Sequence, residues 1–158
     1  MIISLASLMI SAVLLAGCGD TCADNKNALP RAAFYAGEAT VSVDSLEIRG
    51  IGAPGDSILS EGTERKSEIY LPFRIDSDST VYSFDYTGGV KASSIVTFIY
   101  SRTPRFVSAE CGVSYVFDIR KIECKGNLID SVTCPQGFID NAPGVNLRIY
   151  LRTTPEEP

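Results

Sequence analysis

Alternation of apolar and polar residues is the dominant pattern along this 158-residue chain. Successive side chains of a β-strand point to opposite faces, so alternating runs predict strands with one buried face. The clearest runs cover residues 41–48, 113–120 and 145–152. The last of these is expected to be half exposed, because polar or charged residues occupy its second face.

Two further segments predict a hairpin and a central strand. Apolar residues alternate over 71–75 and again over 82–86, and the string Asp76-Ser77-Asp78-Ser79 between them supplies turn chemistry. Residues 94–102 are apolar on both faces, which is typical of a strand covered on both sides.

Seven or eight such strands, with no convincing helical stretch beyond residue 17, indicate a single all-β domain over residues 31–152. Short strands separated by turn signals are typical of an antiparallel β-sandwich, and an immunoglobulin-like Greek key is the favoured topology. The sequence leaves the strand order open. Residues 50–67 are expected to form an exposed excursion, and residues 153–158 a disordered tail.

The first 17 residues carry no ionisable side chain and are at the lower limit of length for a membrane-spanning helix. They end in Leu14-Leu15-Ala16-Gly17-Cys18, which looks like the lipobox of a bacterial lipoprotein precursor. We therefore expect residues 1–17 to be a signal peptide. Cys18 would be the lipidated first residue of the mature chain, followed by a short tether over 18–30. The alternatives are an uncleaved signal anchor and a secreted protein in which Cys18 is an ordinary cysteine.

Beyond Cys18, an exported chain of this kind would hold an even number of cysteines, which implies disulfides. The four are Cys22, Cys111, Cys124 and Cys134. Of three possible pairings we favour Cys22–Cys111 with Cys124–Cys134, because the latter two flank a turn at 125–127. A bond at Cys22 would leave four peptide steps to Cys18, at most about 14 Å, so the domain would lie almost on the membrane.

Charge argues against a general polyanion-binding role, because the net charge is −5, and no nucleic-acid partner is expected. The distribution is uneven: residues 91–152 hold eight basic and five acidic side chains. We interpret this basic half as solvated strand faces. The alternative is a contact with anionic lipid headgroups or with an acidic partner.

Candidate catalytic chemistry is sparse. The chain has no histidine, which excludes Ser-His and Cys-His nucleophile pairs and the usual zinc centres. Glu110 and Asp118 could be imagined as a glycosidase pair but are expected at the surface. The string Asp76-x-Asp78-x-Thr80 resembles the start of a calcium loop, yet Thr87 stands where a bidentate Glu is required. We therefore expect no enzyme, no metal and no cofactor.

Several strings resemble a known family. They are Asp44-Ser45-Leu46, Arg49-Gly50-Ile51-Gly52, Leu71-Pro72, Phe98-Ile99-Tyr100 and, most specifically, Phe106-Val107-Ser108-Ala109-Glu110-Cys111-Gly112. Together with the lipobox they resemble the DUF6452 family of small Bacteroidetes lipoproteins. The resemblance makes the early cysteine after Cys18 the natural partner of Cys111. The resemblance implies no established activity. It also implies a possible partner, a predicted outer-membrane barrel encoded nearby.

The function that these features favour is a non-enzymatic outer-membrane lipoprotein, anchored at the periplasmic face through Cys18. Its sandwich would dock against an outer-membrane or periplasmic protein. Residues 145–152 are a candidate docking edge, because a half-exposed terminal strand can add to another sheet. In the opposing interpretation, Arg148 and Arg152 protect that edge from pairing.

Glycan capture at the cell surface is the competing hypothesis. Sugar-binding platforms use exposed aromatic side chains, and the chain has no tryptophan. The candidate ligand-binding residues are Tyr35, Tyr70, Tyr86 and Tyr150. Aromatic residues at alternating positions are also common in cores, so an exposed row of tyrosines is the feature that would favour this hypothesis.

Overall fold

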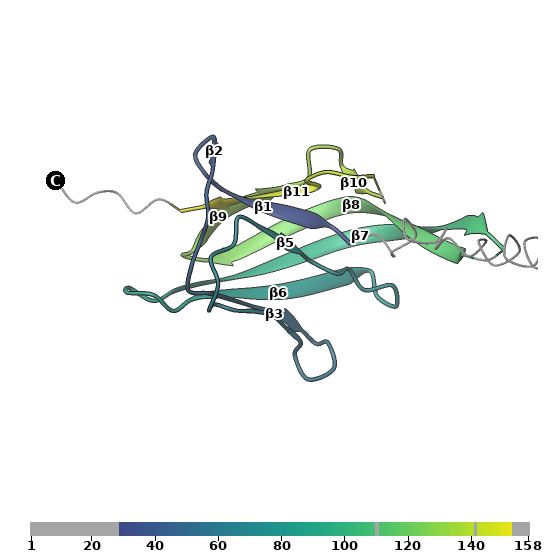
Figure 1. The fold of residues 1–158 in the computed structure, drawn as a ribbon. Coiled ribbons are helices and arrows are strands. Elements are labelled where there is room, and N and C mark those ends of the chain that lie inside the picture. Colours follow the sequence, from purple (N-terminus) through teal and green to yellow (C-terminus); the bar gives the residue numbers. More distant parts are fainter. Residues whose placement is uncertain (1–28, 110, 141, 153–158) are drawn as a thin grey trace, which may run out of the picture.

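The computed structural model describes residues 29–109, 111–140 and 142–152, which form two packed β-sheets (Figure 1). The predicted signal peptide at 1–17, Cys18, Cys22 and residues 153–158 lie outside the described residues. No helix within the described ranges is long and apolar enough to cross a membrane.

One sheet has five strands in the order β2-β1-β11-β9, with β5 also paired to β1. Their bounds are β1 Arg31–Ala36, β2 Ala39–Thr40, β5 Glu68–Tyr70, β9 Ile129–Thr133 and β11 Leu147–Leu151. β1 and β11 run parallel, and the other pairs in this sheet are antiparallel. The first and last strands of the domain are therefore direct neighbours.

The other sheet has six strands in the order β10-β8-β7-β6-β3-β4, all antiparallel. Their bounds are β3 Leu46–Ile51, β4 Ile58–Glu61, β6 Ser79–Tyr86, β7 Ala92–Ser108, β8 Gly112–Gly126 and β10 Phe138–Ile139. The predicted β-sandwich is confirmed, and the structure supplies the strand order. Part of the expected excursion at 50–67 is a paired strand, because β4 lies along β3.

The core lies between the two sheets and is built from alternate residues of their strands. In β11, Leu147 and Ile149 are fully buried while Arg148 between them is exposed, as the alternation predicted. The largest fully buried side chains are Tyr82, Tyr100, Phe34, Phe84, Phe98, Phe117, Ile48, Leu71, Ile129, Ile139, Leu147 and Ile149.

The prediction that residues 94–102 are covered on both faces was wrong. β7 buries Val96, Phe98 and Tyr100 on its inner face, but Ile95 on the outer face is 48% exposed. No described element packs outside the six-stranded sheet, so the apolar residues of its outer face remain accessible to solvent. A strand with apolar residues on both faces can therefore belong to a sheet that is covered on one face only.

The predicted hairpin over 71–86 was also wrong. Residues 71–75 form no strand, and β5 just before them belongs to the five-stranded sheet. The segment instead crosses from one sheet to the other, with Leu71 and Phe73 buried in the core. Pro72 lacks an N–H for a β-ladder. The Tyr82 hydroxyl donates a hydrogen bond to the Pro72 carbonyl and so holds the crossing in place.

Tyr100 fixes the same crossing through a closed ring of hydrogen bonds. Its hydroxyl donates to the Arg74 carbonyl at 2.8 Å and lies 2.7 Å from Thr80 Oγ1. The Arg74 N–H donates to that Thr80 oxygen at 3.0 Å. Because the tyrosine proton is committed to Arg74, Thr80 must donate to Tyr100. Burial raises the pKa of Tyr100, which keeps this donor protonated.

Tyr100→Phe is expected to lower the free energy of unfolding by about 1–3 kcal/mol, because the Arg74 carbonyl and the Thr80 hydroxyl lose their partner in a buried site. Urea denaturation followed by circular dichroism measures the loss. Tyr70→Phe is the control, since Tyr70 is exposed and its hydroxyl takes part in no hydrogen bond among the described residues. Equal stability of the two variants would contradict the role assigned to the ring.

The candidate docking edge at 145–152 was wrong as well. β11 pairs with β1 on one side and with β9 on the other, so its backbone groups are already used. The parallel pairing of the two ends of the domain is the physical reason, because it places the last strand inside the sheet. Arg148 and Arg152 therefore protect no open edge.

Candidate recognition surface

The cysteines do not all behave as predicted. Cys111 is disulfide-bonded, whereas the thiols of Cys124 and Cys134 are free, so the predicted Cys124–Cys134 bond was wrong. Cys18 and Cys22 lie outside the described residues, and the pairing of Cys22 with Cys111 stays a prediction.

The reason for the error at Cys124 and Cys134 is the path of the chain. Cys124 lies in β8 of the six-stranded sheet, whereas Cys134 follows β9 of the five-stranded sheet. Cys124 is hydrogen-bonded to the backbone of Val132, and Cys134 Sγ donates to the Phe138 carbonyl at 3.6 Å. Both side chains pack against the core, and burial raises the pKa of each thiol. Neither has the lowered pKa of a reactive cysteine.

The carboxylates of the string that resembles a calcium loop, Asp76 and Asp78, are paired with arginine side chains. Arg74 makes two hydrogen bonds of 3.0 Å to the Asp76 carboxylate, and Arg102 pairs with Asp78. The Arg74 guanidinium also holds the pKa of Asp76 below its usual value. No cluster of three metal-ligating side chains occurs in the described part of the chain. Of the imagined carboxylate pair, Asp118 lies on β8, and Glu110 is outside the described residues.

The structure brings two of the four candidate tyrosines together on the outer face of the five-stranded sheet. Parallel pairing of β1 with β11 sets Tyr35 beside Tyr150, with ring centroids 5.4 Å apart and planes tilted by 37°. Arg148, two residues earlier on β11, places its guanidinium carbon 5.7 Å from the centre of the Tyr35 ring. We call Tyr35, Arg148 and Tyr150 the tyrosine–arginine face.

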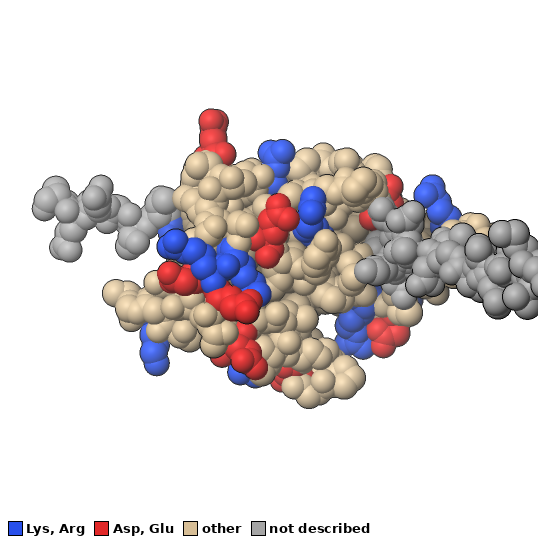
Figure 2. All heavy atoms as spheres, in the orientation of Figure 1, with Lys and Arg blue, Asp and Glu red and all other residues tan. Residues whose placement is uncertain are grey.

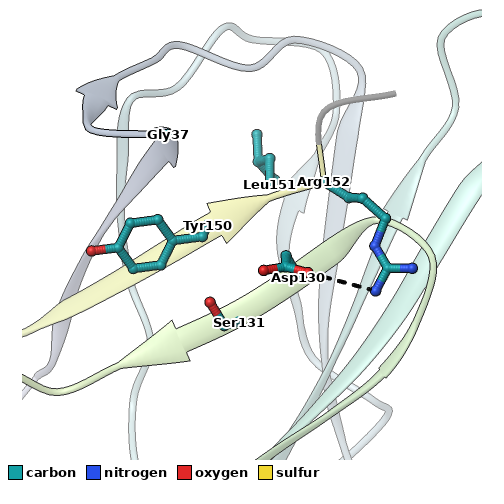
Figure 3. A pocket seen from close by; sticks show the side chains of 6 residues that line it. All are labelled: Gly37, Asp130, Ser131, Tyr150, Leu151 and Arg152. Carbon is teal, nitrogen blue, oxygen red and sulfur yellow. Dashed lines mark ion pairs between the residues drawn. The ribbon is translucent and has the colours of Figure 1, made fainter. Parts of the chain in front are cut away.

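A hollow of about 420 Å³ adjoins this face (Figure 3). Its lining residues are Gly37, Asp130, Ser131, Tyr150, Leu151 and Arg152. Arg152 Nη2 lies 3.9 Å from the Asp130 carboxylate, and Ser131 is the register partner of Tyr150 on β9. The hollow thus sets hydroxyl, carboxylate and guanidinium groups next to an aromatic ring.

The remaining candidate tyrosines lie elsewhere. Tyr70 is exposed on β5, opposite Arg31 at the far end of β1, and Tyr86 belongs to the six-stranded sheet. The sequence thus predicted part of the face but did not single out Arg148 as a neighbour of Tyr35. The two residues are far apart in the chain, and only the parallel pairing of the terminal strands brings them together.

The charges around this surface are mixed in sign. Figure 2 shows basic and acidic side chains lying next to each other in a few groups, separated by broad areas with neither. Arg31 lies 3.5 Å from Glu68, and Arg152 pairs with Asp130 as described. These partly exposed pairs weaken any long-range field, as expected for solvated strand faces.

A family model described as "Family of unknown function (DUF6452)" matches residues 45–151. The chain belongs to this family. The DUF6452 match includes Cys111, Arg148 and Tyr150 and begins after Tyr35. No curated protein and no solved structure matches this DUF6452 chain. Membership confirms the predicted family, whereas the Bacteroidetes origin and the lipid anchor stay predictions. The function is therefore argued from the surface.

Proposed function

We propose that this DUF6452 protein is a non-enzymatic lipoprotein of the outer membrane that docks a second envelope protein. Acyl chains on Cys18 hold the domain at the periplasmic face. The tyrosine–arginine face forms the contact, and a β-barrel in the same membrane is the first class of partner to test. The proposal replaces the rejected docking edge at 145–152 with a sheet face.

The observation that carries this proposal is the grouping of Tyr35, Arg148 and Tyr150 on a face that no other described element covers. Tyrosine and arginine are enriched among the residues that dominate binding energy at protein interfaces. Two tyrosine rings in contact, with a guanidinium held over one of them, lose little side-chain freedom on binding. The lipobox pattern and the absence of histidine support the anchor and the non-enzymatic role.

Glycan capture is the second candidate, and the hollow beside Tyr150 favours it. A sugar presents hydroxyl groups around an apolar ring face, and the hollow offers Asp130, Ser131 and Arg152 next to an aromatic ring. The tyrosine pair is therefore compatible with either class of ligand, and the experiment must separate them.

The test is crosslinking in living cells of the native host before lysis, followed by identification of recovered envelope proteins and of bound glycan. Arg148→Ala is the test variant, Cys18→Ala reports the anchor, and Ile95→Ala is a matched control on the outer face of the other sheet. We expect wild type and Ile95→Ala to recover one envelope protein. Loss of a residue that dominates an interface costs about 2 kcal/mol or more, roughly a thirtyfold fall in affinity, so Arg148→Ala should recover little.

The outcomes are distinct. Equal recovery of the same protein with wild type and Arg148→Ala would reject this face as the docking site. Recovery of glycan without a protein, lost on Arg148→Ala, would favour the second candidate. An intact mass of the purified wild-type protein without acyl chains on Cys18 would reject the anchor.

A further inference from the structure

The hairpin formed by β7 and β8 extends beyond the rest of the sandwich (Figure 1). Pairing of β7 with β6 stops at Ile99, and pairing of β8 with β10 covers only Phe117 and Asp118. Past these positions, residues 103–108 and 112–116 pair only with each other among the described strands. The end of the hairpin is therefore a two-stranded ribbon along which no further described strand pairs, although Ser114 in it is buried and Tyr115 packs against the core.

The tip of this ribbon is apolar. Phe106, Val107 and Val113 are 70%, 46% and 48% exposed, and Phe106 is the register partner of Val113. Single exposed apolar residues are normal on a soluble protein. Three of them at the extremity of a projecting ribbon form a small wedge that nothing in the described domain covers. We call these three residues the ribbon tip.

A positive charge accompanies the apolar tip. Arg105 is exposed next to Phe106 and forms no ion pair among the described residues. An arginine beside exposed aromatic and aliphatic side chains suits the boundary between lipid headgroups and acyl chains, because its charge can stay at the phosphates. The basic excess over residues 91–152 has the same sign.

We infer that the ribbon tip inserts into the interfacial layer of a phospholipid bilayer, an inference that rests on the proposed lipid anchor at Cys18. Cys111, at the turn of the same hairpin, is disulfide-bonded, and the described chain begins at this end of the sandwich (Figure 1). With Cys22 as the partner of Cys111, four peptide steps separate Cys18 from the bonded Cys22. Cys18 therefore lies at most about 14 Å from Cys22. The acyl chains then enter the membrane beside the tip, and the two attachments together set the orientation of the domain.

Tryptophan fluorescence tests this inference directly, because the chain has no tryptophan of its own. Phe106→Trp places one at the tip. Ile95→Trp is the matched control: it lies on the same strand at a site 48% exposed, about 36 Å away along β7. Each mature protein is purified from host membranes and reconstituted into vesicles of phosphatidylethanolamine and phosphatidylglycerol with brominated acyl chains. We expect a shift to shorter wavelength and loss of most emission at position 106, and neither change at 95.

Intact mass of the same samples separates this inference from the proposed anchor. An acylated protein whose tryptophan at position 106 is not quenched would overturn tip insertion and leave the anchor standing. A protein without acyl chains would overturn the anchor. If its tryptophan at 106 were still quenched by added vesicles, tip insertion would hold as an independent membrane contact.

Discussion

Gly126→Ala is expected to lower the free energy of unfolding by about 3 kcal/mol, which is a large part of the stability of a typical domain. A Cβ at this position would lie 2.2 Å from the Ser93 carbonyl oxygen and 2.6 Å from Ser94 Cα. Both obstacles are backbone atoms of the neighbouring strand, so no side chain can rotate to make room. The backbone at Gly126 also has a φ of +130°, a conformation that residues with a side chain rarely adopt.

The position matters because the chain leaves the six-stranded sheet here. Ser94 Oγ accepts hydrogen bonds from the N–H groups of Leu128 and Ile129 at 3.0 and 2.9 Å. Asn127 is also tied to Ser93, its N–H donating to the Ser93 carbonyl at 2.9 Å. A side chain at Gly126 would push β7 away and loosen the contacts that carry the chain into β9.

The matched control for this prediction is Gly144→Ala. Gly144 has the same φ of +130°, but a Cβ there would meet nothing within 4 Å. Urea denaturation of the two variants separates the steric clash from the cost of the backbone conformation. A loss at Gly126 no greater than that at Gly144 would show that the strands separate without penalty, contrary to the close approach described here.

The sequence predicted the strands better than their partners. Alternation in β11 identified its buried and exposed faces correctly, because burial of one face repeats every second residue regardless of the neighbouring strand. Pairing depends on the whole chain. The alternating apolar residues Leu71 and Phe73 resembled one strand of a hairpin. A segment that crosses between the sheets through the core also needs buried apolar side chains, so the pattern does not distinguish the two.

The candidate surface was predictable only in part for the same reason. Tyr35 and Tyr150 could be selected by residue type, yet their contact depends on a parallel pairing between the two ends of the domain. Cys124 and Cys134 were paired on the basis of a turn between them, but that turn is a crossing between sheets. Two residues that flank a turn lie close together when the turn joins paired strands of one hairpin. They need not do so when the turn joins strands of different sheets.

Removal of the Cys111 disulfide is expected to have the largest effect of any single change outside the core. With Cys22 as its partner, the bond closes a loop of roughly 90 residues, and Cys111→Ala should lower the free energy of unfolding by about 4–5 kcal/mol in the chain-entropy model. Denaturation under non-reducing conditions measures the loss. Cys124→Ala is the control, because its thiol is free, and its loss should be much smaller.

The partner of Cys111 follows from two more variants. If Cys22 is bonded to Cys111, Cys22→Ala should match Cys111→Ala, and the double variant should be no less stable than either, because each change removes the same bond. If Cys18→Ala instead reproduces the loss while Cys22→Ala does not, Cys18 is the partner. A cysteine sulfur held in a disulfide cannot also carry a thioether-linked lipid. That result would therefore contradict both the pairing with Cys22 and the proposed anchor, so the stability of these variants bears directly on where the protein acts.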